Sequence, residues 1–73
     1  MKITVENHTT KITRVFNFDT LVCSVYEKEQ DYGLEFFSSL KAMQKELEYC
    51  IESCLEFNFD YTVIHNKLFK NEN

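Results

Sequence analysis

The feature of this sequence that most constrains its fold is the apolar period of residues 38–56, SSLKAMQKELEYCIESCLE. Apolar side chains recur there at spacings of three and four, at Leu40, Met43, Leu47, Cys50, Ile51, Cys54 and Leu55. At about 100° per residue they fall within an arc of roughly 140°. The period therefore predicts one long amphipathic helix with a single buried stripe. Ser38 is its expected N-cap, and Asn58 is expected to end it in the left-handed conformation.

The opposite side of this helix becomes acidic toward its C-terminal end. Glu48, Glu52 and Glu56 stand four residues apart in one column, with Glu46 and Tyr49 beside them. Neighbours in such a column repel by roughly 0.2–0.5 kcal/mol, and the negative end of the helix dipole also disfavours acids there. Two interpretations follow: an ordinary solvated face, which is the commoner case on soluble helices, or a surface that is kept acidic for a partner.

The first part of the chain alternates with the period of β-strands. Its first run alternates Ile and Val with polar residues, and in its second run Ile12 shares one side with Arg14 and Phe16. The polar tetrapeptide Asn-His-Thr-Thr between the two runs is typical of a turn. We therefore expect a β-hairpin over residues 2–18.

Residues 21–26 are rich in β-branched and aromatic side chains, which favours a third antiparallel strand. A rival interpretation begins a short helix at Asp19, because Leu21, Val22 and Val25 also fit helical spacing. We predict the strand.

Residues 27–33, EKEQDYG, form the expected loop and contain the only glycine of the chain. Residues 34–37 fit either a short edge strand or the approach to the long helix. Regular structure points the adjacent aromatics Phe36 and Phe37 in different directions, so either one of them is exposed or a small core absorbs both.

The C-terminal residues 57–69 are open to two interpretations. Phe57, Phe59 and Tyr61 alternate with polar residues, which favours a strand. Asp60 as an N-cap favours a short helix instead, and we predict the helix.

Together these elements predict an α+β fold in a single compact domain, residues 1–73. A small antiparallel sheet of three strands, with a short fourth strand as an option, packs against the long helix, and a short helix follows at the C-terminal end. With 73 residues the chain is near the lower size limit for a self-sufficient core, and at 44% hydrophobic it is too apolar to be disordered. Dimerisation or binding to a partner is therefore a reasonable supplement to its stability.

The expected location follows from what the sequence lacks. No apolar run approaches the roughly 18–20 residues that cross a membrane, and the first residues lack the apolar core of a signal peptide. The three cysteines are an odd number without framework spacing. We therefore expect a reduced, cytoplasmic protein with no membrane partner.

The net charge of −4 is concentrated in the middle of the chain, because residues 27–56 hold eight acidic and three basic side chains. Such a segment repels a phosphate backbone. Direct nucleic-acid binding is therefore not expected.

Candidate chemical groups are few. Cys50 and Cys54 stand four residues apart on one helix face, which is half of a metal-site spacing, and Cys23, His8 or His65 would have to complete it. Both lie inside the apolar stripe, however, and free cysteine is among the most buried residue types. A Cys–His nucleophile pair lacks an accompanying oxyanion-hole motif, and so small a domain has little room for a concave site. We expect no metal, no cofactor and no catalysis.

The sequence therefore predicts a non-enzymatic protein-binding module that docks an acidic loop-and-helix surface on a basic patch of a larger, nucleic-acid-handling protein. Its expected contact residues are Asp31, Tyr32, Glu46, Glu48, Tyr49, Glu52 and Glu56. In size and charge the chain resembles the small acidic antagonists that bacteriophages make against host or defence machinery, including mimics of nucleic-acid charge, and this resemblance implies a viral inhibitor. The alternative is a structural or regulatory homodimer that associates through exposed aromatic residues.

Overall fold

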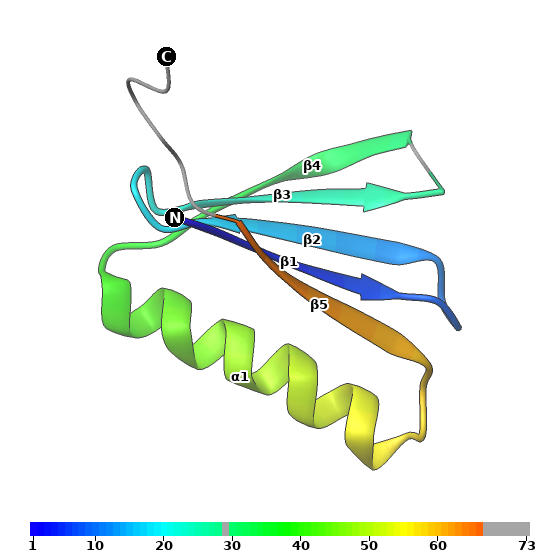
Figure 1. Cartoon of the computed structure of the whole chain (residues 1–73). Helices are drawn as coiled ribbons and strands as arrows, with labels where there is room; N and C mark the ends of the chain where they lie inside the picture. Colours follow the sequence, from blue (N-terminus) through cyan, green and yellow to red (C-terminus); the bar gives the residue numbers. More distant parts are fainter. Residues whose placement is uncertain (29, 67–73) are drawn as a thin grey trace.

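The computed structural model describes residues 1–28 and 30–66, which form one antiparallel five-stranded sheet with a single helix on one of its faces (Figure 1). The elements in chain order are β1 (Lys2–Asn7), β2 (Ile12–Asn17), β3 (Val22–Glu27), β4 (Gln30–Phe36), α1 (Leu40–Glu56) and β5 (Tyr61–Asn66). The α+β class predicted from the sequence is confirmed. The helix of the described residues is not long and apolar enough to span a membrane.

The strand order in the sheet is β4-β3-β2-β1-β5. The first four strands form a meander of hairpins. The helix α1 then crosses one face of the sheet from the β4 edge to the opposite edge, where β5 pairs with β1 (Figure 1). The edges of the sheet are therefore β4 and β5.

Two of the hairpin turns use the same device. At the end of β1, the side-chain oxygen of Asn7 accepts hydrogen bonds from the backbone amides of Thr9 and Thr10. At the end of β2, the side-chain oxygen of Asn17 accepts in the same way from Asp19 and Thr20. Both turns then close with a residue at positive φ, 68° at position 11 and 59° at position 21. An Asn that bonds its own turn favours a reversal at these points, which explains why the hairpin signals were readable in the sequence.

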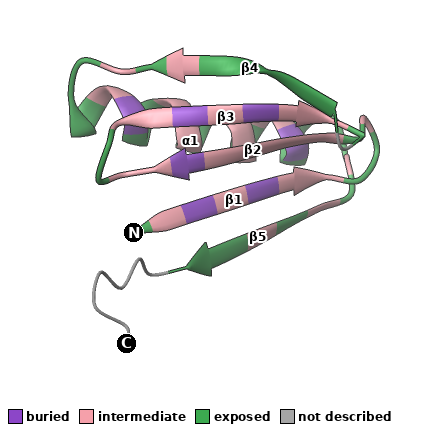
Figure 2. Ribbon diagram, turned by 90° about the horizontal axis from the view of Figure 1, so that it is seen from above, coloured by how far each residue is buried: buried purple, intermediate pink, exposed green. Residues whose placement is uncertain are grey.

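The hydrophobic core lies between α1 and the sheet. The register places Ile3, Val5, Phe16, Cys23 and Val25 on the side that faces the helix, and all five are buried. Figure 2 shows the resulting alternation of buried and partly buried positions along β1 and β3. The predicted hairpin and third strand are therefore confirmed, together with the face assigned to Phe16.

The helix of residues 40–56 confirms the long apolar period, with differences at its margins. Its N-cap is Ser39, whose hydroxyl accepts from the amide of Ala42, and not Ser38. Met43 and Cys54 are buried, whereas Leu40, the first residue of the helix, and Leu55, at the edge of the predicted stripe, are exposed. A single sheet covers a narrower arc of a helix than the stripe spans, because the strands contact only one side of it. Asn58 has a φ of 56°, as predicted.

The loop predicted at residues 27–33 is wrong, because β4 begins at Gln30 and turns this segment into an edge strand. Glu, Gln, Asp and Gly are poor strand formers, but pairing with β3 overrides their preference. The register shifts between Val25 and Tyr26, and Gly33 takes a φ of 142°, so the strand is bulged where its composition is least suited to it.

The helix predicted over residues 57–69 is also wrong within the described residues. Residues 61–66 form β5, and residues 67–69 lie outside the described part of the chain. The alternation that favoured a strand prevailed because β1 offers an open edge and Val63 packs against the core. The turn after β1 also holds this segment: the His8 amide donates to the Asp60 carbonyl at 2.7 Å, and the Asp60 amide donates to Thr9 Oγ1 at 2.9 Å.

Candidate functional site

The acidic column of α1 lies on the side of the helix that faces away from the sheet. Glu48, Glu52 and Glu56 are all exposed. Within residues 1–28 and 30–66 the ion pairs join the Met1 amine to Asp19 and Arg14 to Glu35, and neither involves α1. The helix also has no basic residue in its last turn. The negative charge of the column is therefore not offset by the described part of the chain.

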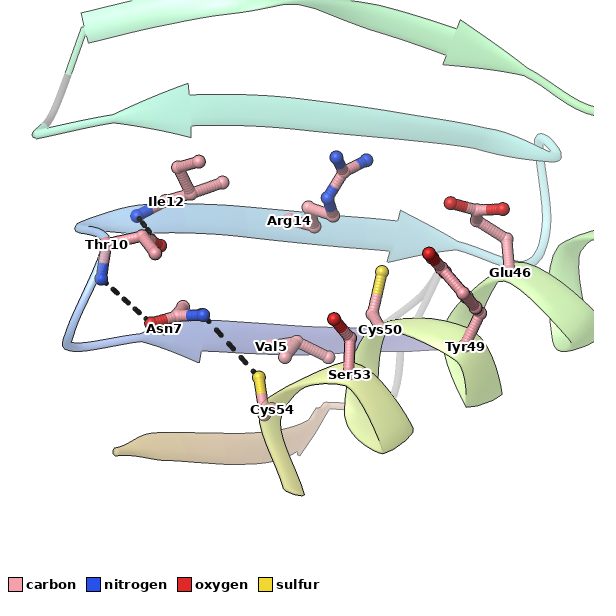
Figure 3. Close-up of a pocket in the computed structure, with 10 residues that line it drawn as sticks. All are labelled: Val5, Asn7, Thr10, Ile12, Arg14, Glu46, Tyr49, Cys50, Ser53 and Cys54. Atoms are coloured by element: carbon pink, nitrogen blue, oxygen red, sulfur yellow. Dashed lines mark hydrogen bonds between the residues drawn. The ribbon is translucent and has the colours of Figure 1, made fainter. Parts of the chain in front are cut away.

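Glu46 and Tyr49 belong to a different part of the helix surface than the column does. Both line a hollow of about 190 Å³ between α1 and strands β1 and β2, shown in Figure 3. Glu46 is partly buried, whereas the Tyr49 side chain is 65% exposed at the rim. Glu46 therefore flanks the sheet side of the helix, whereas Tyr49 lies between that side and the column, three residues before Glu52.

Tyr32 lines a second hollow, of about 290 Å³, on the same side of the sheet. The two hollows share Ile12 and Arg14, so they adjoin. We call their union the helix–β4 groove, and its floor and walls are formed by Val5, Asn7, Thr10, Ile12, Arg14, Val25, Tyr32, Gly33, Leu34, Glu35, Glu46, Tyr49, Cys50, Ser53 and Cys54. Tyr32, on β4, and Tyr49, on α1, stand at its two sides.

The predicted contact residues are thus divided among three places. Glu48, Glu52 and Glu56 form the column, and Tyr32, Glu46 and Tyr49 border the helix–β4 groove. Asp31 pairs in register with Tyr26, so it lies on the opposite face of the sheet. The structure brings the loop and helix residues together only at the groove.

Arg14 is the residue of the groove that sequence reasoning did not select. Its Nη1 donates to Glu35 Oε1 at 2.8 Å, and the two side chains are 27% and 43% exposed. The pair links β2 to β4 across β3, on the side of the sheet that faces the helix. The available signal was the position of Arg14 between two inward-facing apolar residues of one strand, because a cation at such a position needs a partner.

The three cysteines are free thiols on the covered side of the sheet, with Cys23 and Cys54 buried and Cys50 partly buried. Burial raises the pKa of Cys23 to about 12 and that of Cys50 to about 11. Burial also raises the pKa of Cys54, although the Asn7 amide that donates to its Sγ at 3.5 Å acts in the opposite direction. All three are therefore protonated near neutral pH, and a protonated thiol is a poor nucleophile and a poor metal ligand.

The two histidines lie in the turn after β1 and in β5. His8 Nε2 is 2.8 Å from Thr62 Oγ1 at the turn after β1, and His65 is an exposed residue of β5, not of a helix. Among residues 1–28 and 30–66, no three side chains of the types His, Cys, Asp and Glu are grouped so that they could hold a metal ion.

Comparison with known proteins finds no matching family model, no similar characterised protein and no similar solved structure.

Proposed function

We propose that this protein is a non-enzymatic binding module that docks the acidic column of α1 on a basic surface of a larger, nucleic-acid-handling protein and thereby inhibits it. The observation that carries this proposal is the exposure of Glu48, Glu52 and Glu56 without an ion pair among the described residues. Exposed charges of one sign steer the diffusional encounter with a surface of opposite sign and so speed specific association.

The spacing of the column supports a partner that normally binds nucleic acid. A helix rises about 1.5 Å per residue, so carboxylates four residues apart follow one another at about 6 Å along the axis. A regular line of negative charge on a rigid rod presents a basic groove with the kind of field that a phosphate backbone does. Nucleic-acid charge mimicry is therefore the mode of inhibition that we propose.

Affinity capture from native cytosol, followed by identification of the retained protein, would supply the partner for the test. We expect Glu48→Gln/Glu52→Gln to weaken binding to it by on the order of tenfold and to flatten the dependence of affinity on salt, because exposed charges act within a screening length of about 8–10 Å. Adding Glu56→Gln should enlarge both effects.

The matched control is Glu27→Gln/Asp60→Asn, which removes two carboxylates that are not part of α1. It should leave the affinity and its salt dependence nearly unchanged. If the column variant and the control have the same affinity and the same salt slope, the column is ordinary solvated surface and the proposal is wrong.

A further inference from the structure

The face of the sheet opposite α1 is covered by none of the described residues. Figure 2 looks onto this outer face, with α1 behind the sheet. The register gives it three rows of five residues that run across the strands in the order β4, β3, β2, β1, β5. The rows are Phe36, Val22, Asn17, Lys2 and Asn66; then Leu34, Ser24, Val15, Thr4 and Ile64; then Asp31, Tyr26, Thr13, Glu6 and Thr62.

The outer face carries exposed apolar side chains among residues that are mostly polar. Antiparallel sheets that meet solvent on one side generally carry polar residues there. Here Phe36 is 74% exposed, Leu34 is 56% exposed and Ile64 is 36% exposed. Phe36 pairs with Val22 and lies two positions from Leu34 on the same side of β4, so these three residues are contiguous, whereas Ile64 lies on β5 at the opposite edge of the sheet. A contiguous exposed apolar patch marks a surface that is covered in the working state of a protein.

The charges of the outer face point to a second copy of this chain as the cover. Lys2 and Glu6 lie at opposite ends of the β1 outer side, about 13 Å apart for four residues of strand. Thr4 is midway between them, in the middle row. Consider a two-fold axis that runs along the middle row, perpendicular to the strands. Rotation about it places the outer face of one sheet on the outer face of the other, with each strand antiparallel to its copy. Lys2 of one copy then meets Glu6 of the other, and this pair occurs at two symmetric places.

The same axis also determines which apolar residues would meet across the interface. Leu34, Val15 and Ile64 all belong to the middle row, so each would meet its own copy across the interface, whereas Phe36 in the first row would meet Asp31 of the other copy. The apolar contact of this arrangement is therefore centred on the middle row. The two α1 helices, with their acidic columns, would then lie on the far sides of the assembly. Like charges are thereby kept apart, whereas association through the helices would bring them together.

The area of the outer face is sufficient for a specific but modest dimer. Five strands about 4.8 Å apart, each with six residues at about 3.3 Å, make a patch of roughly 24 by 20 Å. Two such patches bury on the order of 1,000 Å², which is the lower end of the range for specific interfaces. A chain of 73 residues, with a core near the minimum for stability, gains from this additional burial.

We propose that the outer face is the interface of a homodimer in which two sheets pack face to face about a two-fold axis along the middle row. The test is sedimentation equilibrium of the protein alone across a range of concentration. We expect a reversible dimer with a dissociation constant on the order of 1–100 µM. A protein that remains monomeric at millimolar concentration would overturn the proposal, and because no partner protein is used, this outcome leaves the role of the acidic column untouched.

Val15→Lys tests the location of the interface, because Val15 is on the central strand and on the outer face. We expect the dimer to weaken at least tenfold, while circular dichroism shows an unchanged fold, since a lysine stem can lie along the sheet with its ammonium in water. Gln44→Lys, on α1, adds the same charge at an exposed position away from this face and should leave the dimer intact. A dimer unaffected by Val15→Lys is joined through a sheet edge or the helix, and the proposal fails.

A charge exchange tests the axis with substitutions that do not touch the core. Lys2→Glu or Glu6→Lys alone should weaken the dimer, because each places like charges against one another across the axis. The double variant Lys2→Glu/Glu6→Lys should restore the original affinity. A double variant that dimerises as poorly as either single one rules out this two-fold arrangement.

Discussion

The two faces of the sheet are built from the same strands, yet they have opposite relations to solvent. On the face toward α1, Ile3, Val5, Phe16, Cys23 and Val25 are between 0 and 8% exposed. On the outer face, side chains of equal or larger apolar area, Leu34 and Phe36 among them, remain mostly in water. Successive residues of a strand point to opposite faces, so Leu34 and Phe36 are exposed because none of the described residues covers the outer face.

The comparison also shows that the covered face is incompletely covered. The helix–β4 groove lies on the same face as the core, and Arg14 occupies it between Ile12 and Phe16 on one strand. One helix of 17 residues cannot span five strands. The uncovered corner on the helix side therefore contains the Arg14–Glu35 ion pair, whereas the outer side of β4 exposes Leu34 and Phe36.

The largest expected difference between the faces is in core truncation. Phe16 and Val15 are neighbours in β2, and Phe16 is fully buried. We expect Phe16→Ala to cost about 3–5 kcal/mol, because it leaves a cavity under the helix, and Val15→Ala to cost less than about 1 kcal/mol. Urea unfolding at a concentration where the chain is monomeric measures both. Equal losses at the two positions would contradict the assignment of the core to one face.

Alkaline pH should lower the free energy of unfolding through the covered face, because all three thiols lie on that side of the sheet. The pKa of Cys23 is raised by burial to about 12 and that of Cys50 to about 11, from 9.0 in the unfolded chain. The folded state therefore holds these protons more tightly, and its stability is complete below pH 9 and falls as the pH rises toward 11–12. The loss is about 1.4 kcal/mol per pH unit for each thiol within that window.

A Cys23→Ala/Cys50→Ala variant isolates this effect. Its free energy of unfolding should be lower at pH 7, because side-chain volume is lost from the core, but should change less between pH 9 and 11 than that of the parent chain. Identical alkaline slopes for the two proteins would show that ionisation elsewhere dominates.

The Arg14–Glu35 ion pair of the helix–β4 groove should contribute less to the free energy of unfolding than the buried core side chains or the protonated thiols do. We expect Glu35→Gln to cost about 1 kcal/mol, since Arg14 would lose a charged acceptor while both side chains stay partly in water. A double-mutant cycle with Arg14→Met separates this coupling from losses in packing. Strictly additive effects in the cycle would mean that the pair is held together by the strands and adds nothing of its own.

The smallest expected effect concerns the acidic column, which belongs to neither face. Replacing Glu48, Glu52 and Glu56 with Gln should raise the stability by about 0.5 kcal/mol, because repulsion within the column is removed. Thermal unfolding in low salt should detect the increase, and high salt should abolish it. A loss of stability instead would mean that the carboxylates have favourable contacts with the rest of the chain.

The sequence predicted those parts of the fold whose information is local. The α1 period, the turn that begins at Asn7 and the alternation in β2 are each contained within a short stretch of the chain. The N-cap was predicted at Ser38 and is observed at Ser39, so even this error is a choice between adjacent residues of the same type.

The parts that were missed depend on partners elsewhere in the chain. β4 has the composition of a loop and is a strand only because β3 pairs with it, and β5 follows a strand pattern that competes with a plausible N-cap at Asp60. The column was predicted because it lies on one helix. The helix–β4 groove was not, because it requires Tyr32, Tyr49 and Arg14 from three different elements.

The pairing of β5 with β1 has a consequence for how the chain folds. Every other ladder joins strands that are neighbours in the sequence, whereas this one closes across the whole helix, as the contact of His8 with Thr62, 54 positions apart, illustrates. Contacts between distant residues form slowly, because the chain entropy is lost before they are made. We therefore expect the meander and α1 to form first and β5 to dock last. Until it docks, β1 is an open edge that accepts β5 of another copy as readily as its own, so a concentrated solution of folding chains is prone to strand exchange.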